Sequence, residues 1–72
     1  MTPSEQILTE TFKLREATAH SDEVARHLRG LILQHHHPLV SEVSVLAETA
    51  TLLNHATQHF ERVAKPKLTP PS

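Results

Sequence analysis

The chain has 72 residues and a formal charge of −1, with seven Lys and Arg interspersed among eight Asp and Glu, seven His and no Cys. This length makes at most one domain, and a chain of this size buries only about 60% of its unfolded surface, so a second copy or a partner is a natural way to bury more. The lack of Cys excludes disulfides, thiolate catalysis and Cys-based zinc sites, and the interspersed charge is not that of a nucleic-acid binder.

The N-terminus carries a helix-start signal and no targeting signal. Thr2 can cap a helix, Pro3 suits its first position, and Glu5 stands where a capping box needs an acid. No basic region precedes an apolar run, and no stretch approaches the roughly 20 apolar residues of a membrane span. We therefore expect a cytoplasmic protein whose first helix begins at residue 3.

Apolar and small side chains then recur at alternating spacings of three and four, the period of one helix face. The pattern passes Ser21 and Gly30 in phase, so we predict one helix over about residues 3–35. A break near Ser21, which would give a three-helix bundle, is the alternative. The stripe consists of Ile7, Leu14, Ala17, Ser21, Val24, Leu28, Leu31 and His35, widened by Thr11, Thr18, Ala25 and Ile32.

Pro38 cannot continue a helix and biases His37 away from the helical region, so we predict a turn over residues 35–38. A second helix is predicted over about residues 38–65, ended by Pro66, and residues 67–72 read as a flexible Pro-rich tail. Its stripe follows the four-three alternation of helices packed at small crossing angles. The members are Leu39, Val43, Leu46, Ala50, Leu53, Thr57, Phe60 and Ala64.

Two helices joined by so short a turn must run antiparallel, so the predicted fold is an all-α helical hairpin domain over residues 1–66. Further apolar side chains lie outside the stripes, and we expect two copies to bury them in a homodimeric four-helix bundle. The alternative is that they are single exposed side chains, which are normal on protein surfaces. The expected self-interface consists of Leu14, Val24, Leu28, Leu31, Val43, Leu46, Leu53 and Phe60.

The sequence has no glycine-rich loop, no nucleophile motif and no carboxylates placed to face a pocket, so we expect neither catalysis nor a cofactor. By elimination, we predict a protein–protein interaction module, a regulatory adaptor or inhibitor that binds a larger protein through an outer helix face. Phe12 lies outside the stripe and is either an anchor for that partner or a clamp at the bundle end. The expected partner-binding residues are Leu8, Phe12, Arg15 and Ala19.

Histidines and arginines supply two alternative functions. His55 and His59 are four residues apart and could bind a divalent metal with His20 as a third ligand, but no recognised zinc spacing is present. Residues 35–37, all histidine, are expected to cap the last carbonyls of the first helix. Arg15, Arg26 and Arg29 could contact phosphate in a nucleic-acid-binding dimer, although Asp22 can pair with Arg26 one turn on.

Overall fold

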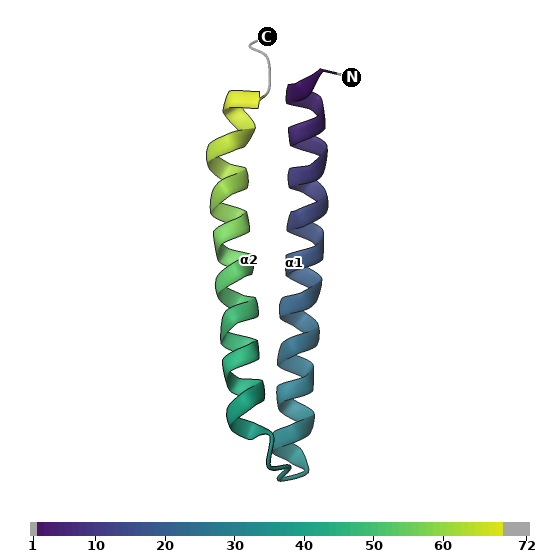
Figure 1. The fold of residues 1–72 in the computed structure, drawn as a ribbon, viewed down its shortest axis with the longest axis vertical. Coiled ribbons are helices and arrows are strands. Elements are labelled where there is room, and N and C mark those ends of the chain that lie inside the picture. Colours follow the sequence, from purple (N-terminus) through teal and green to yellow (C-terminus); the bar gives the residue numbers. More distant parts are fainter. Residues whose placement is uncertain (1, 69–72) are drawn as a thin grey trace.

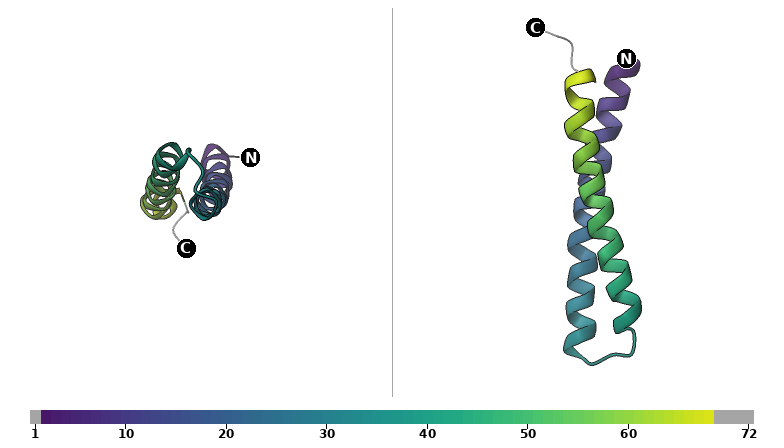
Figure 2. Two further views of the ribbon diagram at one scale, coloured as in Figure 1. Left: turned by 90° about the horizontal axis from the view of Figure 1, so that it is seen from below. Right: turned by 90° about the vertical axis from the view of Figure 1, so that its left-hand side faces the viewer.

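The structure, a computed structural model, describes residues 2–68 and confirms an all-α hairpin. Its two helices are α1, Pro3–Gln34, and α2, Val40–Leu68, which lie antiparallel along their whole length (Figure 1). The chain is a rod whose Cα extents are 55 × 19 × 15 Å. The end-on and side views show that α1 and α2 form a single layer, and no other part of residues 2–68 covers either face (Figure 2). The radius of gyration of 16.3 Å exceeds the value of about 11 Å for a compact domain of this length.

Helix α1 begins as predicted and is continuous. The Thr2 hydroxyl accepts a hydrogen bond from the Glu5 backbone N–H at 3.2 Å, which satisfies one of the free donors at the helix start. The helix then runs unbroken through Ser21 and Gly30 to Gln34. The three-helix alternative, which needed a break near Ser21, is therefore wrong.

The turn is capped by backbone groups and not by imidazoles. The His35 N–H donates to the Leu31 carbonyl at 3.1 Å, and His36 adopts a left-handed φ of 50°, the conformation that commonly ends helices. On the far side of the turn, His37 Nδ1 accepts from the Leu39 N–H at 3.2 Å. The expectation that the histidine side chains cap the last carbonyls of α1 is therefore wrong, because these carbonyls accept from the main-chain N–H groups of residues 35–37.

Both ends of α2 lie later in the chain than predicted. Pro38 lies in the turn and the helix begins at Val40, two residues after the expected start. At the other end the helix continues through Pro66 to Leu68, two residues into the segment expected to be a tail. Proline removes one helical hydrogen bond, yet the helix continues for two residues beyond it, and the side chain of Leu68 is half-buried. Residues 69–72 lie outside the described part.

The seam between the helices is built from small and polar side chains. Three apolar residues in the described part are buried, namely Ala25, Val43 and Ala47. The hydroxyls of Thr11 and Thr57 donate to carbonyls one turn back in their own helices, at 2.7 and 2.8 Å, so their polar groups are satisfied without reaching across. The complete buried set is Thr11, Thr18, Asp22, Ala25, Val43, Ala47, Asn54 and Thr57.

Candidate interaction surfaces

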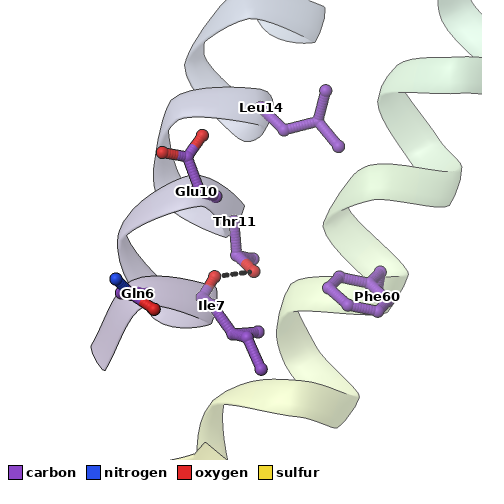
Figure 3. A pocket seen from close by; sticks show the side chains of 6 residues that line it. All are labelled: Gln6, Ile7, Glu10, Thr11, Leu14 and Phe60. Carbon is purple, nitrogen blue, oxygen red and sulfur yellow. Dashed lines mark hydrogen bonds between the residues drawn. The ribbon is translucent and has the colours of Figure 1, made fainter. Parts of the chain in front are cut away.

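The large side chains of both stripes lie beside the seam and not in it. Ile7 and Leu14 of α1 and Phe60 of α2 line one shallow groove of about 330 Å³ (Figure 3). Other large apolar side chains follow at seven-residue intervals on the same flank of each helix. Val24 and Leu31 lie at the edge of this flank that is farther from the seam. We call this surface the apolar face, and its members are Ile7, Leu14, Val24, Leu28, Leu31, Leu39, Leu46, Leu53 and Phe60. All of these side chains are between 41% and 52% exposed.

This arrangement corrects the expected packing of the stripes. In α2 the smaller residues of the predicted stripe, such as Val43 and Thr57, are buried in the seam. The larger ones, such as Leu46 and Leu53, lie beside the seam and are about half-exposed. Val43, expected in an interface with a second copy, is only 3% exposed within one chain and has little surface left to offer. The other seven predicted self-interface residues all belong to the apolar face.

The exposed area is large for the mass of the chain. The 72 residues expose 5571 Å², whereas a compact monomer of 8.1 kDa exposes about 4,500 Å². The difference, roughly 1,000 Å², is similar to the 800 Å² or so that one partner contributes to a standard protein interface. One hairpin therefore leaves open an area that a single association would cover.

A second groove lies on the other flank of the seam and is polar. Arg15 and Ala19 line it from α1, and Glu61 and Arg62 line it from α2. Arg15 Nη1 donates to Glu61 Oε1 at 3.3 Å, and Arg15 Nε lies 3.2 Å from Oε2. The second contact lacks hydrogen-bond alignment, so Oε2 is buried without a hydrogen-bond donor among the described residues. This ion pair joins the two helices near their open end.

Phe12 lies beneath two cations, one of which, Arg15, also lines this groove. The guanidinium of Arg15 is 5.6 Å from the ring centroid, and the ammonium of Lys65 is 5.9 Å from it. Both distances suit cation–π contacts. The structure thus brings together the predicted partner residues Phe12 and Arg15, with Ala19 in the same groove as Arg15. Leu8 is half-buried one turn before Phe12 on the same helix flank.

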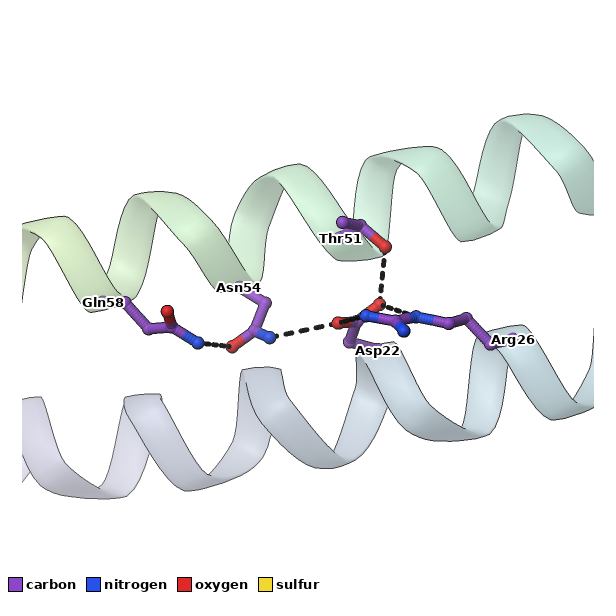
Figure 4. Close-up of polar contacts among 5 residues, drawn as sticks. All are labelled: Asp22, Arg26, Thr51, Asn54 and Gln58. Atoms are coloured by element: carbon purple, nitrogen blue, oxygen red, sulfur yellow. Dashed lines mark hydrogen bonds and ion pairs between the residues drawn. The ribbon is translucent and has the colours of Figure 1, made fainter.

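The strongest polar cluster links the middle of the two helices through Asp22 (Figure 4). Its carboxylate accepts hydrogen bonds from Arg26 Nη2 at 2.6 Å and Arg26 Nε at 3.1 Å, both within α1. From α2 it accepts one from the Thr51 hydroxyl at 2.6 Å and one from the Asn54 amide at 3.0 Å. Gln58 extends the cluster by donating to the Asn54 carbonyl oxygen at 3.3 Å.

These contacts favour the charged carboxylate. Hydrogen bonds from Arg26 and Thr51 hold the pKa of Asp22 well below its ordinary value, although burial acts in the opposite direction. The same pairing raises the pKa of Arg26. The predicted pair between Asp22 and Arg26 is confirmed, whereas the partners from α2 were missed. The available signal was the position of Asn54, seven residues from Ala47, a spacing that places it on the seam side of α2.

The proposed metal ligands are not brought together. Within residues 2–68, no three side chains of His, Asp or Glu are placed to hold a metal ion, so His20 does not complete a site with His55 and His59. Neither helix in the described part has the length and apolar character needed to cross a membrane.

Comparison with protein-family models, with curated proteins and with solved structures finds no match to this chain.

Proposed function

We propose that this chain is a non-catalytic protein–protein interaction module that pairs with a second copy of itself through the apolar face, giving a homodimeric four-helix bundle. One observation carries the proposal. The hairpin buries alanines, threonines and polar side chains in its seam while nine large apolar side chains remain about half-exposed on one flank. Contiguous apolar patches of this kind mark association sites in soluble proteins.

The second copy is favoured as the occupant by self-complementarity and by area. Both helices contribute a row of large side chains at seven-residue spacing, which is the pattern that packs against an identical row in helical bundles. Two copies would give each other the second layer that a single hairpin lacks. An isologous interface also brings the same patch from both chains, so the excess area on each is covered at once.

The outer flank, with Leu8, Phe12, Arg15 and Ala19, is proposed as the surface for a larger protein. A dimer that buries the apolar face leaves this flank free on both of its outer sides. Occlusion of a partner surface by such a flank would make the chain a regulatory adaptor or an inhibitor.

Sedimentation equilibrium at micromolar concentration tests the dimer directly. We expect a mass of twice 8.1 kDa and a melting temperature that rises with protein concentration, because association stabilises the folded state by mass action. Leu53→Asp should dissociate or unfold the dimer, since it places an unpaired charge in the centre of the apolar face. A monomer of 8.1 kDa with a melting temperature independent of concentration would overturn the proposal.

A further inference from the structure

One serine interrupts the large side chains of the apolar face. In α2 the row at seven-residue spacing continues without a small residue through Leu46, Leu53 and Phe60. The corresponding row of α1 contains Ile7, Leu14 and Leu28, with Ser21 between the last two. Ser21 is exposed, and its side chain is much shorter than that of leucine. The middle of the α1 row therefore leaves room for a large side chain from outside the hairpin.

Ser21 lies at the same level along the hairpin as Leu53 of the other helix. Asp22, the next residue of α1, accepts hydrogen bonds from Thr51 at 2.6 Å and from Asn54 at 3.0 Å. These two contacts fix the alignment of the helices at this point. Ser21 and Leu53 therefore form one level of the apolar face, with one small and one large side chain.

The levels on either side of this one carry two large side chains each. Towards the open end of the hairpin, Leu14 and Phe60 line a single groove (Figure 3). Towards the turn, the seven-residue spacing places Leu28 level with Leu46. These large side chains set the separation between the hairpin and any helix that packs on its apolar face.

Two symmetric arrangements bring the apolar faces of two copies together. With the two-fold axis parallel to the helices, both turns lie at the same end of the bundle, and each α1 faces α2 of the other chain. With the axis perpendicular to the helices, the turns lie at opposite ends, and each helix faces its own copy. The facing helices are antiparallel in both cases, so helix direction does not decide between the two arrangements.

We propose that the two hairpins of the dimer point the same way, so that Leu53 of each chain packs against Ser21 of the other. At the level nearer the open end, Leu14 then faces Phe60 of the partner subunit. This inference rests on the proposed homodimer and specifies how the second copy occupies the apolar face. Each chain supplies the large side chain that the α1 row of the other chain lacks.

The packing of large and small side chains favours this arrangement. With the hairpins pointing in opposite directions, Ser21 would face Ser21 of the partner subunit. On either side of that contact, Leu14 would face Leu28 of the partner subunit and hold the two copies of α1 apart, so the space between the serines would stay unfilled. Protein cores contain few such voids, because the side chains that line a void lose packing contacts. In the proposed arrangement each serine has a leucine across from it, and this alternation of small and large lets facing layers interdigitate.

Charged side chains beside the apolar face do not decide between the arrangements. Lys67 follows Phe60 at seven residues in the α2 row. In the proposed arrangement the helix facing it carries Glu10 of the partner subunit, and in the other arrangement it carries Glu42 of the partner subunit. These three side chains are exposed in the hairpin, where single ion pairs contribute little to association. The choice therefore follows from the packing at Ser21.

Distances between spin labels test the direction of the two hairpins. The chain has no Cys, so one introduced thiol carries one nitroxide per chain, and double electron–electron resonance measures the distance between the two labels of a dimer. Gln34→Cys and Glu5→Cys place the label at exposed positions near the turn and near the open end. We expect about 30 Å or less for both, the diagonal of a bundle two helices wide. Hairpins pointing in opposite directions would give at least about 39 Å and about 48 Å, from the helical rise between each label and Ser21. His20→Cys, near the middle, is the control and should give about 30 Å or less in either arrangement.

Disulfide formation tests the contact itself. A disulfide needs Cβ atoms about 3.5–4.5 Å apart, a separation that facing residues of adjacent helices reach and diagonally opposed residues do not. When Ser21→Cys and Leu53→Cys chains are mixed and oxidised, the mixed disulfide should form at least about fivefold faster than the disulfide between two Ser21→Cys chains. His20→Cys in place of Ser21→Cys is the matched control, because it moves the thiol about 100° round the helix, and its disulfide with Leu53→Cys should form slowly. Circular dichroism and sedimentation confirm that each variant keeps its fold and assembly.

Two results would overturn this inference and leave the proposed function standing. One is a dimer in which the labels at Gln34 and Glu5 are about 39 Å or more apart. The other is a dimer in which two Ser21→Cys chains form a disulfide as fast as the mixed pair. A chain that sediments as a monomer of 8.1 kDa would instead overturn the proposed homodimer, and this inference with it.

Discussion

Truncating Leu53 to alanine should weaken the dimer by an amount that follows from its exposure. Fully burying a leucine side chain stabilises by about 1.5–3 kcal/mol, and Leu53 is still 52% exposed in one hairpin. About half of that value, roughly 1 kcal/mol, is therefore gained on association. The substitution occurs in both copies, so the dimer should lose about 2 kcal/mol, which is about a thirtyfold increase in Kd.

Leu52→Ala is the control for this measurement. It removes the same atoms from the neighbouring residue, which is 68% exposed and points about 100° further round the helix, away from the apolar face. Sedimentation equilibrium over a range of concentrations gives both dissociation constants. We expect Leu52→Ala to change Kd less than about threefold. Equal effects of the two substitutions would refute the assignment of the apolar face as the self-interface.

Two further predictions concern stability and pH. Gly30→Ala should stabilise the fold by about 0.5–1 kcal/mol, because Gly30 lies within α1 and an added methyl group meets no atom within 4 Å; urea denaturation showing no gain would contradict this. Asp22→Ala should destabilise more than Lys13→Ala, since it leaves the amide of Asn54 without its acceptor. The pKa of Asp22 is lowered on folding, so its contribution to the free energy of unfolding should be full above its ordinary pKa of 3.8 and should shrink as pH falls below that value. Thermal melts of the wild type and of Asp22→Ala at several pH values will show this.

The helices were predictable from local signals. The cap at Thr2 and the unbroken spacing through Ser21 fixed the start and continuity of α1, and both are observed. Pro38 placed the turn to within two residues. Pro66 was expected to end the second helix, but α2 continues through it to Leu68.

It was less predictable which residues of each stripe pack between the two helices. Each stripe is wide enough to contain a central row and two flanking rows, and any of the three could lie in the seam. The spacing of Leu46, Leu53 and Phe60 predicts an apolar helix face that packs against something. It does not show whether this face packs against the other helix of the same chain or against a second chain. In the hairpin the narrow row containing Thr18, Asp22 and Ala25 takes the centre. Small side chains let the helices approach closely, and the large ones are displaced to the flank. Only the pairing of Asp22 with Arg26 was predicted, because the hydrogen-bond donors to Asp22 on α2 lie about 30 residues away in sequence.

The pairing of Asp22 with Asn54 also decides which alignments of the two helices are disfavoured. The turn over residues 35–39 prevents slippage within one chain, but an exchange of α2 between two chains would be free to choose another alignment. A slip of seven residues in one direction would place Ala47 opposite Asp22, leaving the carboxylate against a methyl group. A slip in the other direction would place Glu61 there, bringing two carboxylates together. One buried acid thus penalises a slip of one heptad in either direction.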